Sequence, residues 1–168
     1  MEKEKVTIIG AGVIGGAIAC AICDDFEVTA TRRKLERLSA LAEKGIKVTT
    51  NNEEAVSEAD IVIISVKPHQ VIPLLKSLSR QLADKLVISF AASINIDLIQ
   101  RVIPRSRIVR AMTNIAVQVK EGYTVYSCGK GIKEEDHAII GKIFEDMGEY
   151  EEVEEQYLDV LTAMAGSS

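Results

Sequence analysis

A glycine-rich turn directly after the first apolar segment constrains the fold of this chain more than any other feature. The segment Lys5–Ile9 predicts a strand, the pattern G-A-G-V-I-G follows at positions 10–15, and an apolar helix is predicted over Val13–Ile22. In such a unit the first glycine permits a tight turn, the second lets a pyrophosphate approach the backbone, and the third lets the helix pack closely on the strand. The N–H groups at the start of the helix would bind that anion. The turn therefore predicts a dinucleotide-binding fold.

The end of the second predicted strand, Glu27–Thr31, indicates which dinucleotide is bound. A site for NAD usually has an Asp or Glu about 20 residues after the first glycine, where its carboxylate accepts from the ribose 2′-hydroxyl. In this chain that place falls at Ala30 or Thr31, and Arg32 and Arg33 follow directly. A guanidinium suits a phosphate that a carboxylate would repel. We therefore predict NADP(H) rather than NAD(H); the alternative is that the two arginines are solvated charges opening the next helix.

Strands and helices are predicted to alternate from the first strand to Met112. Continuous apolar runs such as Ile61–Ile64 are typical of parallel strands buried on both faces, and Pro68 suits the first turn of a helix. We predict an α/β fold, a doubly wound Rossmann-type, mostly parallel sheet with helices on both faces and a ligand crevice beyond the carboxyl ends of the strands. The further predicted strands are Lys47–Thr49, Ile61–Val66, Leu86–Phe90, Arg107–Met112, Tyr123–Ser127 and Glu149–Glu154; helical faces are predicted at Leu35, Leu38, Leu41 and Ala42, at Val71, Leu74, Leu75 and Leu78, and over Lys133–Met147.

The composition argues against several classes of function. A net charge of −5 does not favour nucleic acid, and no apolar run approaches the roughly 18 residues that span a bilayer. Charged residues near the start and the lack of a cleavage-type apolar run argue against a signal peptide, so we expect a cytoplasmic protein. Cys20, Cys23 and Cys128 form no disulfide framework, and with two histidines they make no evident metal site. We expect three buried, reduced thiols.

The last part of the chain combines an acidic stretch with an apolar one. The acidic stretch is most simply a solvated sheet edge that resists the addition of another strand. The segment from Tyr157 predicts an apolar helix that stops at Gly166-Ser167-Ser168. Such a helix either folds back on this domain or packs against a further domain or subunit. The acidic residues are Glu149, Glu151, Glu152, Glu154 and Glu155.

Five segments, in the right order, are similar to the pyrroline-5-carboxylate reductase family. The chain departs from the family at Ser93, where glycine is usual, and after Asn114, where Ile115 replaces the usual Thr-Pro continuation. The segments are G-A-G-V-I-G-G-A-I at 10–18, S-V-K-P-H at 65–69, S-F-A-A-S-I at 89–94, R-A-M-T-N at 110–114 with E-G-Y-T-V-Y at 121–126, and L-T-A-M-A-G-S at 161–167.

The resemblance implies an enzyme of proline biosynthesis that transfers a hydride from NADPH to the C=N carbon of 1-pyrroline-5-carboxylate, a small-molecule imine, and gives L-proline. It implies a dinucleotide-binding domain over 1–154 and, over 155–168, the start of a linker helix toward a helical dimerisation domain that this chain lacks. The full-length family member would be a homo-oligomer through that domain. We therefore expect the chain alone to bind cofactor without full catalysis.

The resemblance also implies the residues of the site. It assigns no catalytic acid; we expect Lys67 to be positional or a phosphate partner, and His69 and His137 to lie on the surface. The implied contacts are Gly10, Gly12, Val13, Ile14 and Gly15 at the pyrophosphate, Thr31, Arg32 and Arg33 at the 2′-phosphate, Asn52 at the adenosine ribose, Ser65, Val66, Lys67 and Pro68 along the cofactor, Ala91 and Ala92 near the nicotinamide, and Met112, Thr113 and Asn114 beside the nicotinamide and imine.

Two other classes of function stay open at the level of sequence. One is another Rossmann reductase of the hydroxyacid dehydrogenase type, which shares the glycine turn but not the motifs around Lys67 and Met112. The other is a nucleotide-binding module without catalysis.

Overall fold

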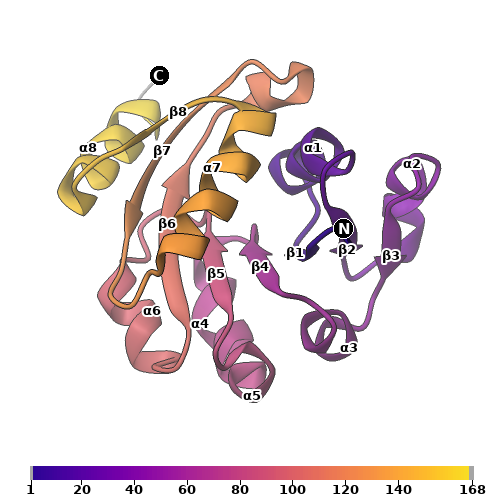
Figure 1. The fold of residues 1–168 in the computed structure, drawn as a ribbon, viewed down its shortest axis with the longest axis horizontal. Coiled ribbons are helices and arrows are strands. Elements are labelled where there is room, and N and C mark those ends of the chain that lie inside the picture. The colour runs from indigo at the N-terminus through magenta and orange to yellow at the C-terminus, as the bar shows by residue number, and fades with distance from the viewer. Residues whose placement is uncertain (1, 167–168) are drawn as a thin grey trace.

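The computed structural model describes residues 2–166 of this chain, and the surroundings of its side chains as far as Leu161. The strands of this part form one sheet, drawn in Figure 1, in the order β3-β2-β1-β4-β5-β6-β7-β8. The predicted strands are confirmed with small changes at their ends. They are β1 Lys5–Ile9, β2 Glu27–Thr31, β3 Lys47–Thr49, β4 Ile61–Ile64, β5 Leu86–Ser89, β6 Arg107–Met112, β7 Gly122–Cys128 and β8 Gly148–Glu152.

The first six strands are parallel to one another, and the last two run in the opposite direction. β1 pairs in parallel with β2 on one side and with β4 on the other, so the chain order reverses between β1 and β4. β7 is antiparallel to β6, and β8 is parallel to β7. The predicted mostly parallel, doubly wound sheet is confirmed. The switch between β1 and β4 is the place where such sheets usually bind ligands.

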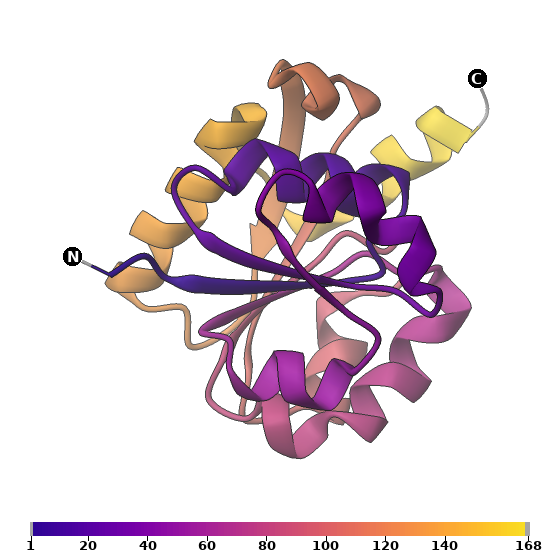
Figure 2. The same ribbon diagram turned by 90° about the vertical axis from the view of Figure 1, so that its right-hand side faces the viewer.

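Helices cover both faces of the sheet, as Figure 2 shows. One face carries α1 and α7, together with η1 and α2; the other carries α3 to α6. A short segment, η2, lies between β6 and β7, and α8 lies against these two strands. The bounds are α1 Val13–Ile22, η1 Leu35–Leu38, α2 Ser39–Ala42, α3 Asn52–Ser57, α4 Pro68–Ser77, α5 Ser79–Leu82, α6 Ile96–Val102, η2 Ile115–Val119, α7 Glu134–Met147 and α8 Glu155–Gly166.

The continuous apolar run of β4 is explained by burial on both faces. Ile61 and Ile63 belong to the core under α1 and α7, whereas Val62 and Ile64 belong to the core under the opposite helices. Successive side chains of a strand point to opposite faces. A central parallel strand therefore needs an apolar residue at every position.

The helical face predicted after β2 is only partly right. Leu38 and Leu41 are buried, but Leu35 is 49% exposed and Ala42 is also exposed. The segment begins as the 3₁₀ turn η1 and continues as one turn of α-helix in α2. A 3₁₀ turn has about 3.0 residues per turn instead of 3.6, so the spacing that aligns four side chains on an α-helix does not align them here.

Several other expectations concern the surface and the cysteines. β8 lies at the sheet edge, with its acidic side chains exposed, as predicted. The three cysteines are free thiols, but they are half-buried rather than fully buried. No helix within residues 2–166 has both the length and the apolar character needed to cross a membrane. Ser167 and Ser168, part of the predicted helix stop, lie outside the described residues.

Candidate cofactor-binding cleft

A cleft of about 360 Å³ lies at the carboxyl ends of β1, β4, β5 and β6. It is therefore at the switch point of the sheet, where α/β folds bind their ligands. Most of the residues that line it are apolar, and Ser65, Lys67 and Thr113 are the polar side chains among them. A wider depression of about 610 Å³ lies among the amino ends of β1 to β3 and contains none of the predicted site residues. The cleft is lined by Gly12, Val13, Ile14, Ser65, Val66, Lys67, Phe90, Ala92, Met112 and Thr113.

The three glycines of the turn have different roles. A Cβ on Gly10, whose φ is +87°, would lie 2.7 Å from the Ser65 carbonyl oxygen, and one on Gly15 would lie 2.7 Å from the Gly10 oxygen. These two glycines are required by packing within the protein. A Cβ on Gly12 would meet nothing closer than the Gly10 oxygen at 4.0 Å. Gly12 faces the open cleft, where a bound group can approach the backbone.

The backbone of the turn leaves the start of α1 free for an anion. The Gly10 and Ala11 N–H groups both donate to the Thr31 carbonyl oxygen, at 3.1 and 3.0 Å, which fixes the turn against the end of β2. Within the described residues α1 has no side-chain cap at Gly12 and no acidic residue in its first turn. The first N–H groups of a helix have no acceptor inside it, and the helix dipole favours a negative charge there. The arrangement suits a pyrophosphate.

Thr31, at the end of β2, is buried and hydrogen-bonded. Its side chain is 1% exposed, and its hydroxyl donates to Asn52 Oδ1 at 2.6 Å. The predicted contact between Thr31 and a 2′-phosphate stays a prediction, and Asn52 next to it is half-buried.

The two arginines after Thr31 lie in the loop that leaves β2. Arg32 is half-buried and Arg33 is exposed, and neither makes an ion pair with an acid of the described part of the chain. The next helical segment begins at Leu35, after Lys34 in an extended conformation. Arg32 and Arg33 thus precede the helix instead of opening it, at the same edge of the sheet as the cleft. Their contact with a phosphate stays a prediction.

The loop after β4 reaches the cleft with three of its four predicted residues. Ser65, Val66 and Lys67 line it, whereas Pro68 is the exposed first residue of α4. The Lys67 N–H donates to Gln70 Oε1 at 3.2 Å, so this backbone is fixed at the start of the helix. His69 and His137 are exposed, as expected.

The loops after β5 and β6 form the opposite wall of the cleft. Ala92, Met112 and Thr113 line it. Ala91 is 4% exposed, and its N–H donates to Ser89 Oγ at 3.3 Å. Asn114 Oδ1 accepts from the Ala116 N–H at 3.2 Å and caps η2. The Ala91 and Asn114 side chains have structural contacts here, and a direct role at the nicotinamide stays a prediction.

Phe90 lines the cleft but was not among the predicted site residues. Its ring packs edge-on against Phe144 of α7, with centroids 6.3 Å apart and planes at 88°. The available signal was its place as the first residue after β5, because the ends of central parallel strands border the crevice.

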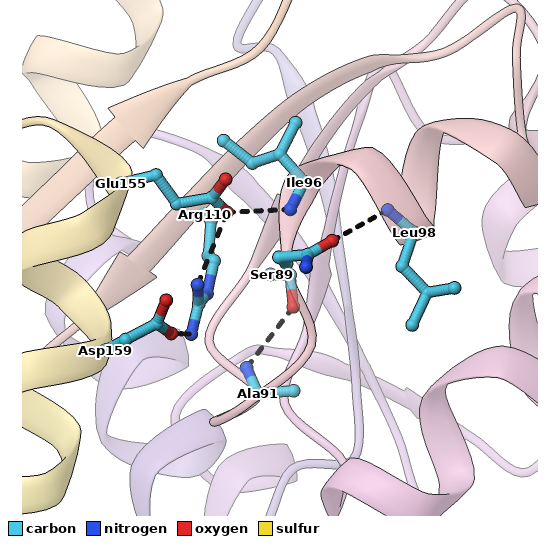
Figure 3. A network of polar contacts seen from close by, with 8 residues as sticks. Ser89, Ala91, Ile96, Leu98, Arg110, Glu155 and Asp159 are labelled. Carbon is cyan, nitrogen blue, oxygen red and sulfur yellow. Dashed lines mark hydrogen bonds and ion pairs between the residues drawn. The ribbon is translucent and has the colours of Figure 1, made fainter.

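An ion-pair network surrounds the buried Arg110, as Figure 3 shows. Arg110 of β6 is 1% exposed and contacts Glu155 Oε2 at 3.3 Å and Asp159 Oδ1 at 2.8 Å. The same Glu155 oxygen accepts from the Ile96 N–H at the start of α6, at 2.7 Å. The prediction that Glu155 is part of a solvated edge is therefore wrong, because its carboxylate joins α8, β6 and α6. Arg110 lies two residues before Met112 of the cleft.

Comparisons with known proteins agree with this geometry. The family described as NADP oxidoreductase, coenzyme F420-dependent, matches residues 5–93, more than half of the chain. Pyrroline-5-carboxylate reductase from Arabidopsis thaliana is 33% identical over 99% of the chain and 63% of its own length. The curated relatives that it matches are longer, and the chain spans between 55% and 65% of their length.

Two solved structures are similar over 99% of this chain. A pyrroline-5-carboxylate reductase from Coxiella burnetii has a TM-score of 0.90 and 28% identity, and the match covers 65% of that chain. A pyrroline carboxylate reductase from Plasmodium falciparum, solved with NADP bound, has a TM-score of 0.87 and 25% identity, and the match covers 63% of it. The chain therefore belongs to the family of NADP oxidoreductases described as coenzyme F420-dependent, and its homologues are pyrroline-5-carboxylate reductases.

Proposed function

We propose that this chain binds NADP(H) in the cleft and is the cofactor-binding part of a pyrroline-5-carboxylate reductase. The observation that carries the proposal is the start of α1, where Gly12 faces open space and the helix has neither a cap nor an acid among the described residues. The proposal of NADP(H) over NAD(H) is supported by the lack of an acid at the end of β2 and by Arg32 and Arg33 after it. A homologous structure carries NADP.

The residues of the chain divide the proposed site into three parts. The first turn of α1 would hold the pyrophosphate, the loops after β2 and β3 would hold the adenosine end, and the apolar wall would hold the nicotinamide. When bound, the dinucleotide supplies the hydride. Val13, Val66, Phe90 and Met112 would exclude water from the reacting face and fix the ring against the substrate. None of these side chains needs to donate a proton for this role.

The reaction proposed for the complete enzyme is reduction of the C=N bond of 1-pyrroline-5-carboxylate to give L-proline. It is supported by the names of the homologues and by the motifs around Lys67 and Met112, both of which line the cleft. The family resemblance further predicts a homo-oligomeric full-length enzyme and a division into a dinucleotide-binding domain over 1–154 and a linker helix after it. The cytoplasmic location expected from the sequence also stays a prediction.

The cofactor proposal is tested by measuring NADPH and NADH dissociation constants for the chain and for an R32A/R33A variant. We expect the double variant to bind NADPH at least about tenfold more weakly, since charge-assisted hydrogen bonds contribute about 1.5–3 kcal/mol each, and to bind NADH about as before. R101A/R105A removes two exposed arginines near α6 and is the control for net charge. Equal loss of both cofactors in R32A/R33A would contradict the assignment to the 2′-phosphate.

Turnover is tested on the same sample by following NADPH oxidation with pyrroline-5-carboxylate. We expect tight NADPH binding with little turnover by this chain alone. Binding of neither cofactor would refute the proposed function as a whole.

A further inference from the structure

The loop between β5 and α6 is held at both of its ends by hydrogen bonds, which Figure 3 draws. At its start the Ala91 N–H donates to Ser89 Oγ at 3.3 Å. At its end the N–H of Ile96, the first residue of α6, donates to Glu155 Oε2 at 2.7 Å. The second bond joins residues 59 positions apart in sequence. The position of this loop therefore depends on α8.

The same loop forms part of the wall at which the nicotinamide is proposed to bind. Phe90 and Ala92 both line the cleft. Ser93, which follows them, has a φ of +67°. A residue other than glycine keeps this conformation only where its surroundings determine it, because the conformation itself costs energy. The shape of the loop therefore requires contacts from outside the loop, and the bond from Ile96 to Glu155 is one of them.

The carboxylate that accepts this bond is oriented by a buried cation. Arg110 of β6 is 1% exposed and contacts Glu155 Oε2 at 3.3 Å, while its other terminal nitrogen contacts Asp159 Oδ1 at 2.8 Å. Arg110 and Met112 are two residues apart on one strand, so their side chains leave the same face of the sheet. One oxygen of Glu155 thus contacts both the strand that ends with Met112 and the loop that carries Ala92.

We propose that Glu155 is a positioning residue for the nicotinamide wall of the cleft, because it holds the loop of Phe90 and Ala92 through the Ile96 N–H. The inference rests on the proposed function and deepens it, since Glu155 does not itself line the cleft. Without this acceptor the half-buried N–H is left unpaired or the loop moves toward another partner. The glycine turn and the loops after β2 and β3, proposed to hold the rest of the cofactor, do not include this contact.

Two ligands that differ only in the nicotinamide test the proposal. NADPH and 2′-phospho-ADP-ribose share the adenosine end and the pyrophosphate, and the second lacks the nicotinamide. Their dissociation constants are measured for each variant at a temperature at which circular dichroism shows it folded. E155A removes the acceptor, and we expect about fivefold weaker NADPH binding, since the lost bond acts on the cofactor only through the loop. Binding of 2′-phospho-ADP-ribose should change by less than about twofold.

E155Q distinguishes the acceptor from the charge. An amide keeps one acceptor oxygen for the Ile96 N–H but has no charge for Arg110. We therefore expect E155Q to bind NADPH within about twofold of the unaltered chain, although the variant is less stable. D159A is the matched control, because it removes the other carboxylate at the same guanidinium while the Ile96 N–H keeps its acceptor. It should change neither constant.

I96P removes the donor at the other end of the same bond. Ile96 is the first residue of α6, where Pro is favoured, and Asn95 before it has φ −78° and ψ 164°, a conformation that suits a residue before Pro. The carboxylates at Arg110 are unchanged. We expect I96P to lose as much NADPH affinity as E155A, which keeps the proposal testable if E155A does not fold. The double variant E155A/I96P should bind NADPH no more weakly than either single variant.

Several outcomes would overturn the positioning role. Equal loss of NADPH and 2′-phospho-ADP-ribose in E155A and I96P would indicate a general effect on folding, and unchanged NADPH binding in E155A would mean that the carboxylate positions nothing. A loss in E155Q as large as in E155A would assign the effect to the charge instead of the acceptor. Equal affinity of the unaltered chain for the two ligands would mean that the wall contributes nothing to binding. Binding of neither ligand by the unaltered chain would instead refute the proposed function, and the positioning role with it.

Discussion

Ser93 has a backbone conformation that ordinary residues avoid. Its φ is +67°, in the left-handed region, in the loop between β5 and α6 that also carries Ala92 of the cleft. The resemblance to pyrroline-5-carboxylate reductases places a glycine at this position, and the structure supplies the physical reason. A glycine adopts this conformation without the clash that a Cβ causes.

Replacing Ser93 with glycine is therefore expected to stabilise the protein. The gain should be about 0.5–1 kcal/mol in the free energy of unfolding, which is the usual size of such a correction. Urea unfolding of S93G and the unaltered chain measures it. Ser39, whose φ is −56° in α2, provides the matched control, and S39G should lower the free energy of unfolding by a similar amount. A loss of stability in S93G would show that the Ser93 side chain contributes more than its backbone strain costs.

At the scale of single residues, the sequence predicted which residues form the turn and the strand ends better than it predicted which of their side chains are buried. Gly10, Gly12 and Gly15 follow from the spacing of a known turn, and their different surroundings agree with their expected roles. Thr31 was placed at the right end of the right strand. Its burial depends on α3 packing beside β2, which a one-dimensional pattern does not contain.

At the scale of elements, a pair of carboxyl groups joins the loop after α1 to the last turn of α7. Asp146 of α7 is half-buried, and its Oδ2 has no hydrogen-bond partner among the described residues. Burial, then the hydrogen bond and charge of Asp25, raises the pKa of Asp146 to about 6. The hydrogen bond with Asp146 lowers the pKa of Asp25, which also contacts Lys142 at 3.5 Å. The two groups share one proton and titrate together.

This pair makes the stability of the protein depend on pH in a definite direction. The folded state holds the Asp146 proton more tightly than the unfolded chain, whose aspartates have a pKa of about 3.9. The stabilisation is complete below about pH 4 and is lost as the pH rises through about 6. D146N keeps a neutral side chain at every pH. The free energy of unfolding of D146N should equal that of the unaltered chain at pH 4 and exceed it by about 1 kcal/mol at pH 8. The difference is kept small because solvent screens the exposed Asp25.

Chemical unfolding at several pH values between 4 and 8 measures the difference. E145Q alters the exposed neighbour of Asp146 and should show no such pH dependence. A D146N curve parallel to that of the unaltered chain would mean that the two carboxyl groups do not share a proton.

Several element boundaries were predictable from the sequence. β1, β2, β3, β6 and α1 begin and end at the predicted residues, and the glycine turn marks the start of α1. The continuously apolar β4 and β5 end at Ile64 and Ser89, earlier than the predicted Val66 and Phe90, because the apolar run continues into the loops that border the cleft. The segment after β2 was less predictable, since a 3₁₀ turn and one turn of helix share too few residues to show a period.

At the scale of the whole molecule, the sequence pattern predicted neither the reversal of strand direction at β7 nor the packing of α8 against the sheet. The apolar segment from Tyr157 left two alternatives open, folding back or an external partner. The structure shows folding back for one side of α8, where Leu158 is fully buried. Tyr157 and Val160 on the same helix are 53% and 55% exposed. No hydrophobic period specifies the ion pairs of Arg110, because they join residues 45 and 49 positions apart.

The docking of α8 should depend far more on Glu155 than on Asp159, although both contact the same guanidinium. Glu155 is 29% exposed and also accepts from the Ile96 N–H, whereas Asp159 is 58% exposed. Breaking a buried ion pair costs several kcal/mol because it leaves a buried charge without compensation, and exposed pairs contribute about 0–1 kcal/mol. We expect E155Q to lose about 2 kcal/mol of unfolding free energy and D159N less than about 1 kcal/mol.

Hydrogen exchange resolves where that loss occurs. In E155Q the amides of residues 155–161 should exchange faster, because α8 then opens without unfolding the sheet. The amides of β1 and β4 should still exchange only by global unfolding. D159N keeps the Glu155 contact and is the matched control, since it removes one charge from the same network. Equal losses in the two variants, or faster exchange throughout the sheet in E155Q alone, would mean that Arg110 stabilises the core itself and not the attachment of α8. The expected result would mean that Arg110 attaches α8 to β6, two residues before Met112 of the cleft.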